Sequence, residues 1–120
     1  MAITTTVPLF IPQGATYIHT FYYVDDNDDA IDLTGFDARM QIRESLDDDT
    51  VQFDGSTDTG EIEITPAEGK VEVTIEEATT EGFDFTRGVY DLEIIDSTGR
   101  VTRLAKGPVQ VDPEVTRENV

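Results

Sequence analysis

Carboxylates dominate the side chains of this 120-residue chain that could do chemistry. Asp and Glu number 26 against eight Lys and Arg, giving a formal net charge of −18. With so many carboxylates, some pair falls at any chosen separation by chance, so their number does not indicate a glycosidase-type acid/base pair. The chain has no Trp, and three of its four tyrosines gather in one segment that we expect to be buried. No aromatic groove for a sugar is therefore predicted.

The single histidine, His19, lies between Tyr17 and Phe21 in an apolar run, where a packed core residue is the expected role. A catalytic base needs a nucleophile and an orienting partner, and the sequence offers neither. A zinc site needs several His or Cys ligands, but the chain has one His and no Cys. We therefore expect no enzymatic activity, no catalytic residues and no cofactor.

One acidic run has the spacing of a calcium loop. Asp25, Asn27 and Asp29 match the D-x-N-x-D start of an EF-hand. The next position is Ala30, where that loop needs Gly, and the twelfth is Phe36, where it needs a bidentate Glu. The EF-hand is thereby excluded. Asp25, Asn27 and Asp29 stay candidate ligands of a looser calcium site, with a solvated turn as the alternative.

The net charge restricts the partners. Nucleic-acid backbones and anionic membranes both attract clustered Lys and Arg, so we expect the chain to bind neither. The acidity has two interpretations: a solvated surface that keeps the protein soluble, or a mimic of the DNA backbone that occupies a basic groove. The N-terminal residues lack the pattern of a signal peptide, and no apolar run is long enough for a membrane span. We expect synthesis in the cytosol.

Apolar residues recur with a period of two along most of the chain, which is typical of strands. The predicted strands cover residues 3–11, 15–24, 31–33, 36–43, 51–53, 61–65, 70–75, 88–95, 100–105 and 109–111. We predict an all-β fold, a single antiparallel β-sandwich that is immunoglobulin-like or jelly-roll-like, with at most one short helical turn near 76–80. Residues 1–111 form the domain, and 112–120 form an exit segment that is disordered alone or contacts a partner.

The same pattern predicts which residues fill the core and which reach partners. Segment 15–24 is apolar on both faces, so we expect a strand buried between layers. The predicted core includes Phe21, Tyr23, Leu33, Met40, Ile42, Ile64, Val73, Tyr90, Leu92 and Ile94. Four arginines are expected on the outward faces of two strands, as a docking patch or as partners of local Asp and Glu. The interface candidates are Arg39, Arg43, Arg100 and Arg103, with Val7, Leu9, Phe10, Val115 and Arg117 from the terminal segments.

Two stretches resemble a known family. AIDLTGFDARMQIR (30–43) and GVYDLEIIDSTGRVTRLAKGPVQV (88–111) are similar to stretches that recur in small structural proteins of tailed bacteriophages. In particular they resemble the N-terminal domain of phage upper baseplate proteins. That domain is a compact β-sandwich that anchors receptor-binding appendages to the virion. The chain differs in having Gly14-Ala15-Thr16 where the family has a Gly-Asp-Thr turn.

The resemblance implies a function in assembly. Upper baseplate proteins continue into further domains, so for a chain of this length we expect a structural module that attaches at the tail, neck or baseplate. Capsid decoration is the second expectation, and a DNA-mimic inhibitor is the third. The implied partners are other phage structural proteins and copies of the chain itself. The implied location is the virion, after synthesis in the host bacterial cytoplasm.

Overall fold

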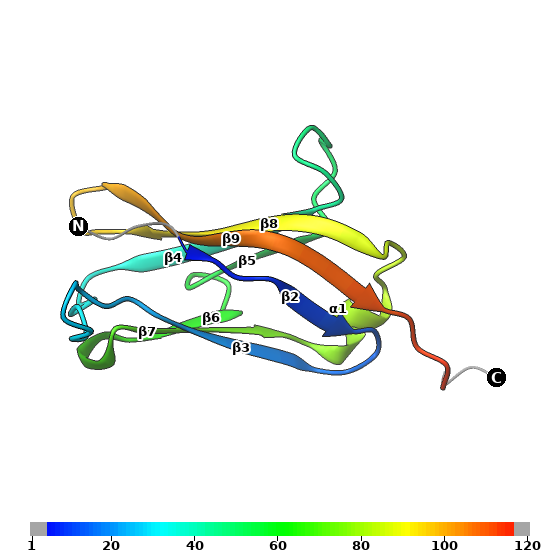
Figure 1. The fold of residues 1–120 in the computed structure, drawn as a ribbon, viewed down its shortest axis with the longest axis horizontal. Coiled ribbons are helices and arrows are strands. Elements are labelled where there is room, and N and C mark those ends of the chain that lie inside the picture. Colours follow the sequence, from blue (N-terminus) through cyan, green and yellow to red (C-terminus); the bar gives the residue numbers. More distant parts are fainter. Residues whose placement is uncertain (1–4, 117–120) are drawn as a thin grey trace.

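The fold is described from a computed structural model, and residues 5–116 are described (Figure 1). Its strands and helical turns are β1 (Thr5–Thr6), β2 (Leu9–Pro12), β3 (Tyr17–Tyr22), β4 (Asp37–Arg43), β5 (Phe53–Ser56), β6 (Ile62–Thr65), η1 (Pro66–Glu68), β7 (Lys70–Ile75), α1 (Glu77–Glu81), β8 (Arg87–Ile95) and β9 (Val101–Asp112). Helix α1 is the helical turn predicted near 76–80, and η1 is a second, 3-10 turn inside the β6–β7 connection. None of the described helices is long and apolar enough to cross a membrane.

The strands form two sheets that pack face to face (Figure 1). The larger sheet has the order β1-β9-β8-β4-β5, with β2 also paired to β9, and the smaller has the order β3-β7-β6. In an immunoglobulin-like sandwich, strands B, E and D share one sheet, while G, F, C and an added C′ share the other. The order found here is that arrangement, so the predicted β-sandwich is confirmed and its topology is immunoglobulin-like.

The N-terminal strands depart from a purely antiparallel pattern. β1 and β2 both run parallel to β9, whereas the other pairs are antiparallel. The link between β1 and β2 lies tightly on β9, because a Cβ on Gly107 would come within 2.5 Å of the Val7 carbonyl oxygen. The Val7 carbonyl also accepts a hydrogen bond of 2.7 Å from the Tyr90 hydroxyl. A glycine at 107 and a tyrosine at 90 thus place the N-terminal strands at the edge of the larger sheet.

The core between the sheets follows the predicted alternation closely. Eight of the predicted core residues are buried: Phe21, Leu33, Met40, Ile42, Val73, Tyr90, Leu92 and Ile94. The other two, Tyr23 and Ile64, are partly buried against the same core. Strands with one apolar face therefore reveal their inward side chains from the sequence alone.

The prediction for segment 15–24 is wrong in one respect. β3 pairs only with β7 among the described residues and forms an outer strand of the smaller sheet. Its inward face carries Tyr17, His19 and Phe21, but Ile18 and Tyr22 are 56% and 58% exposed on the other face. A two-layer sandwich offers each strand only one buried face, so the second apolar face of β3 meets solvent.

Candidate interaction surfaces

His19 belongs to a row of aromatic rings inside the sandwich. Its ring lies 4.5 Å from that of Phe21, and Phe21 in turn lies 6.3 Å from Tyr90. The Tyr17 hydroxyl lies 3.4 Å from Nδ1 of His19. Burial lowers the pKa of His19, which favours a neutral ring at physiological pH. These contacts are those of a packing residue.

The candidate calcium loop is a turn closed by its own carboxylate. Oδ1 of Asp25 accepts hydrogen bonds from the backbone N–H groups of Asn27 and Asp29, at 2.8 and 3.0 Å. This bonding is the local Asx-type closure that favours Asp in turns. Within residues 5–116, no three His, Cys, Asp or Glu side chains gather closely enough to hold a metal ion. The geometry corresponds to the solvated-turn alternative.

The arginines predicted to form a docking patch lie among acidic partners. β4 and β9 flank β8 on opposite sides, so their arginines are not direct neighbours. Nε of Arg39 lies 2.7 Å from Oε1 of Glu93, and Nε of Arg103 lies 3.8 Å from Oδ2 of Asp91. The alternative of local pairing therefore describes both residues. Arg100 lies in the hairpin loop before β9, not on the strand face where it was predicted.

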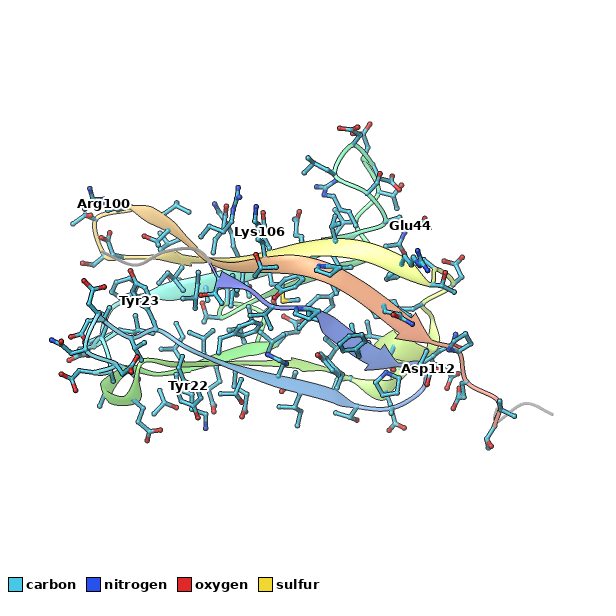
Figure 2. All side chains as sticks on the ribbon, in the orientation of Figure 1. Tyr22, Tyr23, Glu44, Arg100, Lys106 and Asp112 are labelled. Carbon is cyan, nitrogen blue, oxygen red and sulfur yellow. The ribbon has the colours of Figure 1, made fainter. Side chains whose placement is uncertain are left out.

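A shallow groove crosses this outer face of the larger sheet. It has a volume of about 490 Å³ and runs between β8, β9 and the projecting β4–β5 loop, which carries Leu46. Arg43, Arg103 and Lys106 line it, and Figure 2 shows Lys106 on the side turned away from the smaller sheet. Arg43 is already engaged, because it donates to the Asp48 carbonyl at 2.7 Å. We call the outer face of β4, β8 and β9 the charged face.

The interface candidates from the terminal segments differ in their exposure to solvent. The Leu9 side chain is 1% exposed in the core, so its prediction as a contact residue is wrong. In β2 the odd positions point inward and Phe10 points outward, 65% exposed. Val7 is partly buried against the core, whereas Val115 is exposed. Arg117 lies outside the described residues.

β2 and β3 expose apolar side chains, and no residue of β3 was among the predicted interface candidates. Residues 1–24 contain no Asp, Glu, Lys or Arg, so every charged side chain of this strongly acidic chain follows residue 24. We call residues 9–24, with β2 and β3, the uncharged flank. Its exposed apolar side chains are Phe10, Ile18, Tyr22 and Val24. Although burial raises the pKa of the Tyr17 hydroxyl, the backbone of Phe10 lies close enough to that hydroxyl to lower the pKa by a smaller amount, so β2 approaches the start of β3.

The β3 edge differs from the other sheet edges. Unpaired edge strands invite pairing with another chain, and proteins protect them with charge, proline or shortness. β2 ends in Pro12, β5 contains Asp54, and the four-residue β6 carries Glu63. β3 is six residues long and has none of these protections. Figure 2 shows Tyr22 on the outer side of this strand and Tyr23 between the sheets.

Hydrogen bonds between residues far apart in sequence fix the β2–β3 turn, in the middle of the flank. The buried hydroxyl of Thr80 in α1 donates to the Ala15 carbonyl at 2.8 Å and accepts from the Gly14 N–H at 3.0 Å. The Gln13 side chain donates to the Phe83 carbonyl at 2.8 Å. These contacts hold the β2–β3 turn against α1. The bonded residues are more than 60 positions apart in the sequence, so no local sequence pattern could predict these bonds.

Comparison with known proteins finds only remote similarity. No family model matches the sequence, and no curated protein is significantly similar to it. A structure of VGSC beta subunits, described for their multimeric cell-adhesive interactions, shares 9% identity over 93% of this chain and 96% of that chain, with a TM-score of 0.45. Extracellular domains 3–5 of Drosophila OTK share 12% identity over 92% of this chain and 33% of that chain, with a TM-score of 0.35.

Proposed function

We propose that this chain is a non-enzymatic assembly module that docks onto other proteins through the uncharged flank. A single observation carries the proposal: four large apolar side chains, three on β2 and β3 and Val24 just after β3, are exposed in a segment without any charge, in a chain of net charge −18. Large apolar side chains that gather on the surface of a soluble protein mark interaction sites. If these strands carried charged side chains as well, the hydration of those charges would oppose docking of a partner.

The charge distribution suits such a module. Like charge on the rest of the surface keeps copies soluble and apart before they meet a specific partner. The flank is where a partner can approach with the least desolvation of charged groups. Its position also leaves the core intact, since Leu9 and Ile11 point inward from β2 while Phe10 points outward. Docking at Phe10 therefore needs no rearrangement of the sandwich.

The particle that we propose for this module is the virion of a tailed phage. The support is the sequence resemblance to phage upper baseplate proteins, whose two stretches contain β4 and most of β8 and β9, the central strands of the larger sheet. Attachment at the tail, neck or baseplate is the proposed role, with other structural proteins and further copies as partners. A DNA mimic is disfavoured, because Arg39, Arg103 and Lys106 interrupt any array of carboxylates on the charged face.

The experiment combines particle analysis with substitutions on the flank. Mass spectrometry of purified particles of the phage that encodes the chain should detect it, and its absence would contradict virion membership. Incorporation of Phe10→Lys and Tyr22→Lys variants should then fall sharply. Leu46→Lys is the control, because Leu46 is also a large apolar side chain and is even more exposed, but lies beside the groove of the charged face. Loss of incorporation for the control alone would place the docking surface at the groove instead. Deleting residues 1–12 is unsuitable, since it removes Leu9 and Ile11 from the core.

A further inference from the structure

We infer that β3 pairs with β3 of a second copy of this chain, antiparallel and about a two-fold axis at Thr20. The pairing joins the two small sheets into one continuous sheet across the dimer. The inference rests on the proposed role of the uncharged flank and adds to it the identity of one partner and the register of the contact. Addition of a strand to an exposed sheet edge is a common mode of protein recognition.

The ladder between β3 and β7 determines which backbone groups are available. The Tyr23 N–H donates to the Gly69 carbonyl at 2.8 Å, so Tyr23 points its backbone toward the β7 side. In an antiparallel pair such residues alternate with residues whose N–H and C=O point away. Ile18, Thr20 and Tyr22 therefore present their backbone groups at the outer edge. They are also the residues whose side chains lie on the solvent face of the sheet.

This edge is complementary to itself in one register. Pairing Thr20 with Thr20 of the second copy places Ile18 opposite Tyr22, twice by symmetry. Aromatic and β-branched side chains form favourable cross-strand pairs, as do two threonines. A two-fold contact requires that the same patch serve both copies. The three outward residues Ile18, Thr20 and Tyr22 meet that requirement, because Thr20 is their midpoint and lies on the axis. No other described edge offers three successive outward positions without a charge or a proline.

Electrostatics determines how this contact responds to salt. The strand itself has no charge, but acidic groups lie near both of its ends: Asp25 to Asp29 follow it, and Glu77 and Glu81 belong to α1 beside its start. Antiparallel pairing brings the end of one β3 toward the start of the other, so these groups repel. Salt screens that repulsion between exposed charges. The dimer should therefore strengthen as salt is added. An acidic ligand bound in the groove lined by Arg43, Arg103 and Lys106 would instead bind more weakly, because salt screens attraction as well.

The test uses the purified full chain. Sedimentation equilibrium should show a dimer whose dissociation constant falls by about tenfold or more between about 0.01 M and 1 M salt, over which the screening length shortens from ~30 to ~3 Å. Ile18→Lys and Tyr22→Lys should abolish the dimer, whereas Leu46→Lys should not. A monomer at every salt concentration overturns the inference. So does a dimer that survives both β3 substitutions.

A cysteine substitution tests the register, because the chain has no Cys of its own. Under mild oxidation Thr20→Cys should form a disulfide-linked dimer, since directly opposed residues bring their Cα atoms within the ~4.4–6.8 Å that a disulfide spans. Thr74→Cys is the control: it lies on the same sheet, one strand further in, opposite Ile18. Equal cross-linking of both variants would overturn the register. A monomeric chain whose Tyr22→Lys variant still fails to enter particles would refute the self-pairing and leave the proposed docking flank standing.

Discussion

The uncharged flank and the charged face expose different kinds of side chain. The charged face belongs to β4, β8 and β9, whereas the flank consists of β2 at the edge of the larger sheet and β3 at the edge of the smaller one. On the charged face, arginines stand beside glutamates and aspartates, as in Arg39 with Glu93 and Arg103 with Asp91. The flank has no charged side chain and exposes Phe10, Ile18 and Tyr22. The difference teaches that a large net charge need not be spread evenly. Here none of the charged side chains lies within residues 1–24, which include the whole flank.

The largest effect should come from the core that supports both regions. Leu92 in β8 is fully buried beneath the charged face. Leu92→Ala should lower the free energy of unfolding by about 2–5 kcal/mol, because it removes buried methyl groups and leaves a cavity. Urea denaturation followed by circular dichroism measures the change. Ile18→Ala on the exposed face of β3 is the comparison and should change stability by less than ~1 kcal/mol. A cost for Ile18 as large as for Leu92 would mean that the flank is core rather than surface.

A smaller loss is expected where the flank is attached. Thr80 is fully buried, and its hydroxyl bonds both Gly14 and Ala15. Thr80→Val keeps the shape but leaves those backbone groups without the hydroxyl, at a cost of about 1–3 kcal/mol. Hydrogen exchange should show faster opening of the β2–β3 turn than of β8. Uniform destabilisation of both regions would contradict a local role for Thr80.

Tyr90 holds the link before β2 through the Val7 carbonyl and makes stability sensitive to alkali. Burial raises the pKa of Tyr90 well above its usual value of about 10. A raised pKa in the folded state gives stability that is complete below the unfolded value and is lost as the pH rises above it. Unfolding should therefore become easier above about pH 10. Tyr90→Phe should weaken this dependence and cost about 0.5–1.5 kcal/mol at neutral pH for the lost hydrogen bond. Equal alkaline sensitivity of both proteins would assign the effect to other tyrosines.

The two regions also differ in how far the sequence predicts them. Strict alternation in β4 and β8 gave Met40, Ile42, Leu92 and Ile94 correctly, because one face of each strand is polar. In β3 both faces are apolar, and that pattern fits a strand between two layers as well as a docking edge. Alternation within β2 separates inward Leu9 from outward Phe10, although both were predicted to be contact residues.

Other features depend on tertiary structure that local patterns do not report. The pairing of β9 with β8 shifts by one residue near Leu92, and this irregularity lets Arg103 and Lys106 line the same groove. The hydrogen bond from Gln13 to the Phe83 carbonyl joins residues 70 positions apart. The absence of charge over residues 1–24 was visible in the sequence. Composition alone could not say that this segment would lie on an edge. The sheet order β3-β7-β6 shows that β3 is an edge strand, which the sequence did not reveal.

The smallest effect should come from the charged face itself. The Arg39 side chain is 56% exposed and that of Glu93 26%, so solvent and salt screen their contact of 2.7 Å. Exposed ion pairs usually contribute about 0–1 kcal/mol, and Glu93→Gln should stay within that range. Thermal unfolding at low and at high salt measures it, and the small difference from the parent protein should vanish at high salt. Because the substitution also removes one negative charge from a chain of −18, weaker self-repulsion offsets part of the loss. A loss above ~2 kcal/mol would mean that the pair is effectively buried, and that the charged face is as structural as the core beneath it.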